Sequence, residues 1–365
     1  MQKLLLRSRV YVAIPALILM LGVGGWLILS HIPWYAVPSS ALIKELYATS
    51  ETKILDRNGH IIHTLRSDFE RRRLEWVGLE NISPALTASV IASEDQRFFT
   101  HNGVDPLAFF RVIYQMITSG KKPQGASTLT MQLAGMIDPD LRPGRYQIRR
   151  SISQKFNQIF YAWSVEQSWS KPDILEAYLN LVSFRGEIQG VGAASKAFFD
   201  KKATGLNDEE VAILAVTLRA PNAEISITVK RACDLRQILV ENFQCDEINH
   251  LTKKVLTPPY HIRREANIAP HIAQKLLREE TTRPDIISTT LDIDVQNYVN
   301  DSIQNHIGSL KERNLHDAAV LVLDNSTGNV IAYVGSSGFL SKAKHVNGVQ
   351  ARRQAGSSLK PFIYL

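Results

Sequence analysis

The sequence contains only two cysteines, Cys233 and Cys245. They match neither a Cys-x-x-Cys motif nor a spacing typical of metal ligands, which argues against a zinc site or a thiol redox centre. If both lay on one unbroken helix, they would be about 18 Å apart, too far for a disulfide. We therefore expect two buried thiols, and one disulfide is the alternative if this part of the chain is exported.

Signatures of nucleic-acid binding are also missing. The sequence has no helix-turn-helix, zinc-finger or RNA-binding motif, although its net charge is +7 and its pI is near 9.3. A modest basic excess without such motifs suits a membrane surface or an anionic substrate. The chain has 365 residues, 45% hydrophobic and 21% charged, which is enough for two domains and unlike a disordered protein.

One long apolar run lies near the N-terminus, at residues 10–29. A helix of about twenty residues spans about 30 Å, the thickness of one hydrocarbon core. Lys3, Arg7 and Arg9 precede the run, which favours a cytoplasmic N-terminus. We expect a cytoplasmic tail over 1–9 and an uncleaved transmembrane anchor over 10–30. A cleaved signal peptide is the alternative, but the run is long for one and no Ala-x-Ala site directly follows it.

The stretch Glu94–Gly103 is the most informative one for function. An apolar helical run precedes it, with Ser83 as the expected N-cap and Pro84 at the first helical position. Glu94 and Asp95 then fall at a helix end, where the macrodipole favours cations and two carboxylates add little stability. Aromatic residues follow at once, and a carboxylate beside aromatic surface suits a general acid or base. The plain alternative is a solvated helix end whose phenylalanine pair belongs to the core.

This stretch resembles the first signature motif of the peptidoglycan glycosyltransferase family, Glu-Asp-x-x-Phe-x-x-His-x-Gly. The family's second motif, Gly-x-Ser-Thr-x-Thr-x-Gln, follows in order. The matching residues are Glu94, Asp95, Phe98, His101 and Gly103, and then Gly125, Ser127, Thr128, Thr130 and Gln132. The resemblance implies that Glu94 is catalytic, that Asp95, Phe98 and His101 bind the substrate, and that the second motif lines the site for the sugar and pyrophosphate. By itself, Ser127 can cap a helix over 127–136, and a hydroxyl-rich helix start can bind an anion.

Three further motifs of the family follow. The basic run 142–163 resembles the third motif, which implies that Arg149 and Lys155 bind the substrate's pyrophosphate; a solvated helix face is the alternative. The usual motif has a second glutamate where this chain has Gln158, one helical turn from Lys155, so both can face one cleft. Glutamine does not ionise near neutral pH, so one charge of the usual pair is missing. Residues 174–180 and 189–199 resemble the fourth and fifth motifs.

As a whole, the chain resembles the class A penicillin-binding proteins, closest to their 1C type. The resemblance implies a mainly α fold, in which a membrane-anchored, lysozyme-like helical glycosyltransferase domain precedes the truncated start of an α/β transpeptidase domain. The expected parts after the anchor are a connector over 31–78 with a β-hairpin at its Asn-Gly turn, the glycosyltransferase domain over 79–222, a linker over 223–288 and the truncated transpeptidase domain over 289–365.

The last stretch contains Ser-x-x-Lys, at Ser357 and Lys360. On a helix these positions share a face, so the amine can take the serine proton before the serine forms an acyl-enzyme. Thr-Thr-Leu-Asp at 289–292 and two expected strands, 318–324 and 329–335, precede it as in a transpeptidase. The Ser-x-Asn and Lys-Thr-Gly elements that the family needs are missing from the sequence, so we expect this acylation site to be incomplete.

The resemblance implies that the protein polymerises lipid II into β-1,4-linked glycan strands in bacterial cell wall synthesis. Its expected place is the inner membrane, with the catalytic part in the periplasm. Its expected partners are lipid II, the growing glycan chain, the membrane and other cell wall synthesis proteins, and not nucleic acid. Mg²⁺ or Mn²⁺ would be shared with the substrate's pyrophosphate, without a protein metal cage or an organic cofactor. A lysozyme-like hydrolase and an inactive remnant that serves as a binding scaffold are the alternatives.

Overall fold

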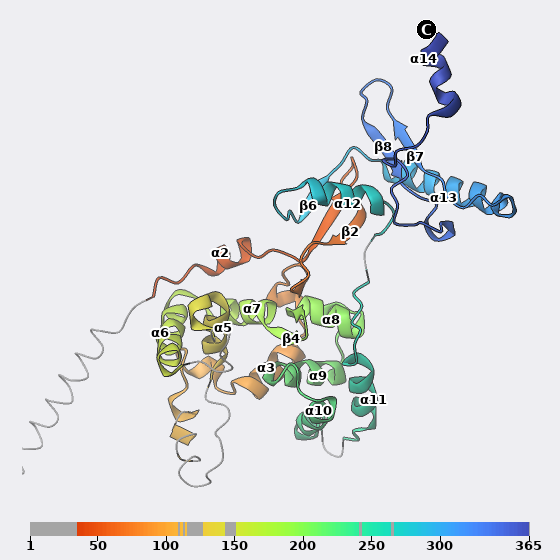
Figure 1. Cartoon of the computed structure of the whole chain (residues 1–365). Helices are drawn as coiled ribbons and strands as arrows, with labels where there is room; N and C mark the ends of the chain where they lie inside the picture. The colour runs from red at the N-terminus through yellow and green to blue at the C-terminus, as the bar shows by residue number, and fades with distance from the viewer. Residues whose placement is uncertain are drawn as a thin grey trace, which may run out of the picture. The chain divides into compact units, whose positions relative to one another are not determined.

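The computed structural model describes residues 35–108, 110, 111, 114, 127–142, 151–240, 243–263 and 266–364 (Figure 1). The chain divides into two compact units, one of residues 1–46, 78–182 and 234–241, the other of residues 47–77, 183–233 and 242–365. The expected tail and anchor over 1–30 lie outside the described residues, as do Gly125 and Arg149. Within the described ranges, no helix is both long and apolar enough to cross a membrane.

The first unit is helical. Its principal helices are α3 (Pro84–Glu94), α5 (Leu129–Ile137), α6 (Ile152–Ser168) and α7 (Lys171–Leu181), with the short α2 (Ser40–Glu45) and the 3₁₀ turns η1 (Leu79–Asn81), η2 (Phe98–Thr100) and η3 (Pro139–Leu141). Helix α5 packs against both α6 and α7 (Figure 1). The apolar side chains that these helices bury include Leu86, Val90, Leu129, Leu133, Ile174 and Tyr178.

Capping residues set where these helices begin. Ser170 and Asp173 form the capping box at the start of α7. Helix α5 begins later than expected, because Thr128 and not Ser127 is its N-cap and accepts the N–H of Met131. Ser127 therefore lies outside the helix, where its hydroxyl accepts a hydrogen bond from Lys155 of α6.

The second unit combines small sheets with helices. Strands β1 (Glu51–Leu55) and β2 (Ile61–Arg66) form the predicted hairpin, and β6 (Ile286–Ser288) pairs parallel with β1. A second sheet has the order β3 (Arg72–Arg73), β5 (Ile188–Gln189), β4 (Ser183–Arg185). The remaining elements up to residue 288 are α8 (Val191–Phe199), η4 (Ala203–Gly205), α9 (Asp208–Arg219), most of α10 (Ile225–Leu239), α11 (Asp246–Val255) and α12 (Pro270–Glu279). The segment expected to be a linker thus carries three helices and a strand.

The expectation of two buried thiols is wrong. Cys233 and Cys245 form a disulfide with a Cα–Cα distance of 5.6 Å, and neither residue is fully buried. Helix α10 ends at Leu239, and Cys245 is the N-cap of α11, so the two cysteines lie on different helices and not on one continuous helix. This break removes the separation of about 18 Å on which the expectation rested.

The residues after 288 contain the elements that the sequence predicts. Asp292 caps α13 (Ile293–Ser309), and β7 (Val320–Leu323) pairs antiparallel with β8 (Val330–Val334). Val299, Ile303 and Ile307 of α13 pack on the inner side of this pair. The turns η5 (Lys311–Arg313), η6 (Gly338–Leu340) and η7 (Gly356–Leu359) follow, and α14 (Lys360–Tyr364) ends the described chain.

Candidate active site

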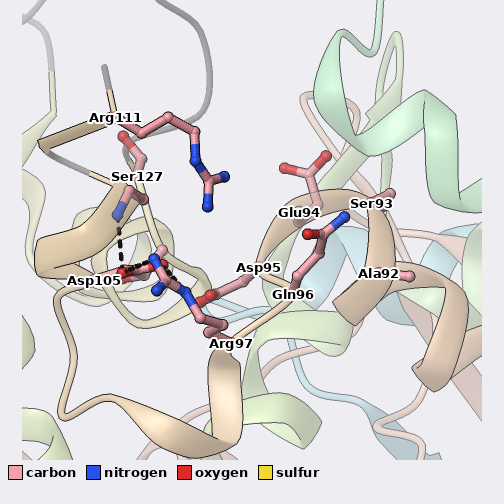
Figure 2. Close-up of a pocket in the computed structure, with 11 residues that line it drawn as sticks. Ala92, Ser93, Glu94, Asp95, Gln96, Arg97, Asp105, Arg111 and Ser127 are labelled. Atoms are coloured by element: carbon pink, nitrogen blue, oxygen red, sulfur yellow. Dashed lines mark hydrogen bonds and ion pairs between the residues drawn. The ribbon is translucent and has the colours of Figure 1, made fainter. Parts of the chain in front are cut away.

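A cavity of about 230 Å³ lies in the first unit, at the end of α3. Glu94, Arg97, Arg111 and Ser127 contribute polar side chains to its wall. In Figure 2 the side chains of Glu94 and Arg111 extend into this space from opposite sides. The cavity therefore offers a proton acceptor on one side and a permanent positive charge on the other. Sequence reasoning missed Arg111, because a single arginine after the first motif has no distinguishing pattern.

Glu94 is held by a chain of hydrogen bonds that begins in the core. The hydroxyl of Tyr178 donates to Oε1 of Gln132 at 3.2 Å, and Nε2 of Gln132 donates to Oε2 of Glu94 at 3.1 Å. Burial raises the pKa of Tyr178 well above its ordinary value, and the charge of Glu94 acts in the same direction. The tyrosine therefore keeps its proton and fixes the Gln132 amide with its NH₂ group toward Glu94. The sequence placed Tyr178 in the fourth motif, residues 174–180, without a contact to Gln132.

Asp95, the next residue, has a different environment. Its side chain is 3% exposed, and its two oxygens lie 2.9 and 3.1 Å from Nε2 of His101. Oδ2 also accepts the N–H of Leu129 at 3.0 Å. Leu129 is the first residue of α5, where the macrodipole favours a carboxylate. Asp95 thus joins the end of α3 to the start of α5 and supports the position of Glu94.

Glu166 and Lys171 hold the loop after α3 from another direction. The Glu166 carboxylate accepts the hydroxyl of Thr130 at 2.5 Å and the ammonium of Lys171 at 2.8 Å. Lys171 also donates to the carbonyl of His101 at 2.7 Å and lies 4.4 Å from the centre of the Phe98 ring. Sequence reasoning missed both residues, since their spacing resembles that of an ordinary surface pair.

The loop also depends on close backbone packing. Gly103 has φ +84°, and a Cβ at this position would lie 2.8 Å from the carbonyl oxygen of Ala162. The hydroxyl of Thr128 donates to the carbonyl of Gly103 at 2.5 Å. Phe98 is fully buried but Phe99 is 63% exposed, so only the first of the expected aromatic pair belongs to the core.

Arg97 and Asp105 form an ion pair at the cavity wall (Figure 2). Nε of Arg97 donates to Oδ2 of Asp105 at 3.0 Å, and the same guanidinium reaches Oδ1. Burial alone would raise the pKa of Asp105, but the N–H of Ala108 and the Arg97 guanidinium together hold it below its ordinary value. Asp105 is therefore a fixed anion that orients Arg97.

Lys155 reaches the same wall from α6. Its ammonium donates to Oγ of Ser127 at 2.7 Å and to Oε1 of Gln158 at 3.2 Å. Nε2 of Gln158 donates to the carbonyl of Met131, and this glutamine is only 1% exposed. Lys155 and Gln158 thus face one side, as their spacing predicts, and Ser127 connects them to the cavity.

Arg142, in the basic run of the third motif, has a structural partner in this conformation. It donates from Nε to the carbonyl of Gly135 at 3.1 Å and from its terminal nitrogen to that of Met136. These carbonyls belong to the last turns of α5, where the macrodipole favours a cation. Arg149, which the third motif predicts to bind the substrate, lies outside the described residues.

Ser357 and Lys360 lie on η7 and at the start of α14, and both are exposed. Over residues 266–364, no hydrogen bond joins their side chains. The described residues therefore do not show the serine–lysine hydrogen bond that acylation needs, and the acylation role of this pair stays a prediction.

No group of three or more His, Cys, Asp or Glu side chains in the described part of the chain is arranged to hold a metal ion. Asp95, next to the cavity, already accepts from His101 and from the Leu129 N–H.

Residues 58–243 match the family model described as Transglycosylase, so the chain belongs to the transglycosylase family. Penicillin-binding protein 1C of Escherichia coli (strain K12) is 32% identical over 79% of this chain and 37% of its own length. The biosynthetic peptidoglycan transglycosylase of Haemophilus influenzae is 36% identical over 52% of this chain and 77% of its own length.

Penicillin-binding protein 2D of Bacillus subtilis (strain 168) is 27% identical over 91% of this chain and 47% of its own length. The chain thus spans less than half the length of the two penicillin-binding proteins. Among solved structures, penicillin-binding protein 1A of Haemophilus influenzae aligns with 77% of this chain and 33% of its own, at 14% identity and a TM-score of 0.31. The family assignment rests on the sequence matches.

Proposed function

We propose that this chain is a peptidoglycan glycosyltransferase that polymerises lipid II into β-1,4-linked glycan strands. The observation that carries the proposal is the position of Glu94, fixed by Gln132 at a cavity whose opposite wall bears Arg111. Transfer of a sugar from a lipid pyrophosphate needs a base beside the acceptor and positive charge beside the leaving group. Membership of the transglycosylase family supports the same reaction class.

In the proposed mechanism, Glu94 accepts the proton of the acceptor sugar's hydroxyl while the hydroxyl oxygen attacks the donor's anomeric carbon. The bond from that carbon to the pyrophosphate oxygen breaks, and the pyrophosphate leaves with the electron pair. Attack from the opposite face converts the α-linked donor into a β-linked product. Glu94 then returns its proton to solvent.

Positive charge on the cavity wall stabilises the departing pyrophosphate. Arg111 lines the cavity directly, and Lys155 reaches it through Ser127. Mg²⁺ or Mn²⁺ carried in with the substrate would neutralise part of the same charge. Such an ion would be held chiefly by phosphate oxygens, because Asp95 is already engaged.

We propose further that residues 10–30 anchor the protein in the inner membrane, with the catalytic part in the periplasm. A lipid-linked substrate suits an anchored enzyme, and a disulfide between Cys233 and Cys245 suits an oxidising compartment. If the anchor is uncleaved, the full chain should stay in the membrane fraction after alkaline carbonate extraction, and release into the soluble fraction would contradict it.

Polymerisation of lipid II by the detergent-purified chain, with Mg²⁺ or Mn²⁺, tests the proposed activity. We expect glycan chains that a muramidase digests. A lysozyme-like hydrolase would instead shorten preformed glycan, and a binding scaffold would do neither; a folded protein with either behaviour would contradict the proposal.

A further inference from the structure

We propose that the ion pair between Glu166 and Lys171 positions the catalytic carboxylate of Glu94. The inference rests on the proposed function, in which Glu94 is the general base. Both members of the pair lie in the described part of the unit that holds the cavity, and neither is one of the residues lining it. The pair therefore acts on the reaction through other residues.

The Lys171 end of the pair holds the loop that follows α3. Its ammonium donates to the carbonyl of His101 at 2.7 Å and lies 4.4 Å from the centre of the Phe98 ring. The imidazole of His101 in turn binds the buried carboxylate of Asp95, with Nε2 lying 2.9 Å from Oδ1. Asp95 directly follows Glu94, so Lys171 fixes the end of α3 from which Glu94 reaches the cavity.

The Glu166 end of the pair holds α5. Its Oε1 accepts both the Thr130 hydroxyl at 2.5 Å and the Lys171 ammonium at 2.8 Å. Thr130 is the second residue of α5, and Gln132, which donates to Glu94, lies two residues further along that helix. The pair therefore joins the two elements that carry the catalytic carboxylate and its hydrogen-bond partner, and it sets how far apart they lie.

The surroundings of the pair leave it little freedom. The Glu166 side chain is 5% exposed and that of Lys171 is 19% exposed, so water screens the attraction between them only weakly. A Cβ on Gly103 would lie 3.2 Å from Cγ of Glu166, which shows that the loop also packs directly on the glutamate. A change at either member of the pair should therefore move the loop.

The experiment compares the parent with Lys171→Met, which keeps the length of the side chain but removes the ammonium. Initial rates of polymerisation over a range of lipid II concentrations give kcat and KM. We expect kcat to fall by about 10–100-fold, because a small displacement of a catalytic group costs about this factor, and KM to stay within about twofold of the parent's value. A parent-like kcat, with any loss of activity confined to KM, would overturn the proposal.

Amide hydrogen exchange reports on the loop itself, without catalysis. The N–H of Phe98 donates to the Asp95 carbonyl at 2.9 Å. The N–H of Thr100 donates to the Arg97 carbonyl at 2.8 Å. We expect these two amides to exchange at least about tenfold faster in Lys171→Met, the factor that a lost charge-assisted hydrogen bond carries. Exchange at the parent's rate would overturn the proposal.

Lys201→Met is the matched control. Lys201 pairs with Glu210, whose side chain is 7% exposed, so this substitution also removes the lysine beside a buried glutamate. The second pair belongs to the other unit. We expect Lys201→Met to lower the thermal midpoint but to keep the parent's kcat and the parent's exchange in the loop after α3. Losses equal to those of Lys171→Met would overturn the proposal, since general destabilisation would then explain both.

The double variant Glu166→Gln with Lys171→Met covers the case in which Lys171→Met does not fold. It removes the buried charge together with the lysine, and the glutamine oxygen can still accept from Thr130. We expect a folded protein whose kcat stays about 10–100-fold below the parent's, because the donor to the His101 carbonyl is removed. A parent-like kcat in the double variant would overturn the proposal.

The two readouts keep this proposal separate from the proposed function. A parent that polymerises lipid II, with Lys171→Met at the same kcat, refutes the positioning role alone. A parent that does not polymerise, with faster exchange in the loop of Lys171→Met, refutes the activity and keeps the role of the pair in holding the loop.

Discussion

At the scale of single residues, two neighbouring carboxylates take separate tasks. Asp95 is the C-cap of α3, with φ −158° and ψ 71°, so its side chain leaves the helix in a new direction and reaches His101 and the Leu129 N–H. Glu94 is the last helical residue and stays on the cavity wall with Gln132 as its partner. The sequence marks both residues, but the division of their roles follows from the backbone between them.

Asp105 should give the protein a pH-dependent stability. Its folded pKa is below its ordinary value, so its contribution is complete above the unfolded pKa of about 3.9 and is lost as the pH falls through the folded value. We expect Asp105→Asn to lower the urea midpoint at pH 7, and to lower it less at about pH 3. Urea unfolding at the two pH values measures this, with the exposed Asp140→Asn as the control. An equal loss at both pH values would show that the charge of Asp105 is not responsible.

At the scale of elements, the loop after α3 is fixed by close packing as well as by hydrogen bonds. Gly103 and Gly59 have nearly the same φ, +84° and +85°, but only Gly103 has backbone where a Cβ would lie. We expect Gly59→Ala to cost about 1 kcal/mol for its left-handed conformation, and Gly103→Ala to cost about 2 kcal/mol more and to reduce polymerisation. Chemical denaturation gives the free energy of unfolding of each variant. The loss in Gly59→Ala measures backbone strain alone, and the additional loss in Gly103→Ala measures the steric clash. Equal losses would contradict the packing account.

The disulfide links α10 to the start of α11. Its removal by Cys233→Ser with Cys245→Ser should lower the stability of the folded chain by about 2–4 kcal/mol, because the unfolded chain loses a constraint. Thiol titration of the denatured, unreduced protein should find no free thiol, and the double variant should melt at a lower temperature. Two free thiols in protein purified from an oxidising compartment would contradict the pairing.

Short sequence signals predicted turns and helix ends well where the structure depends only on neighbouring residues. The Asn58-Gly59 turn and Pro84 at the first position of α3 both appear as expected. The disulfide was missed because the separation of the cysteines was judged for one unbroken helix, and neither glycine nor proline in residues 240–245 marks the break between α10 and α11.

The candidate site was predicted in its residues but not in its contacts. The motifs mark Glu94 and Gln132, yet nothing in their spacing shows that Tyr178 orients the glutamine. Glu166 and Lys171 were missed because their importance depends on what lies across the helix interface, namely Thr130 and the His101 carbonyl. Such long-range pairings depend on the packing of α5, α6 and α7, which local sequence patterns do not encode.

At the scale of the whole molecule, residues 289–364 carry a Ser-x-x-Lys motif on elements that resemble the start of a transpeptidase. Ser357 and Lys360 are both exposed, and no hydrogen bond in the described part of the chain joins their side chains. We expect the 365-residue chain to form no stable adduct with labelled penicillin, because the serine lacks an oriented base. A labelled gel band that disappears in Ser357→Ala would contradict this.

The central claim is that Glu94 is the general base of glycosyl transfer in this chain. Its most direct test is the initial rate of lipid II polymerisation by the parent, by Glu94→Gln and by the exposed control Glu45→Gln, together with lipid II binding. We expect Glu94→Gln to lose roughly 10²–10⁴-fold in rate while lipid II affinity is kept, and Glu45→Gln to match the parent. Glycan synthesis by Glu94→Gln at the parent's rate would contradict the account.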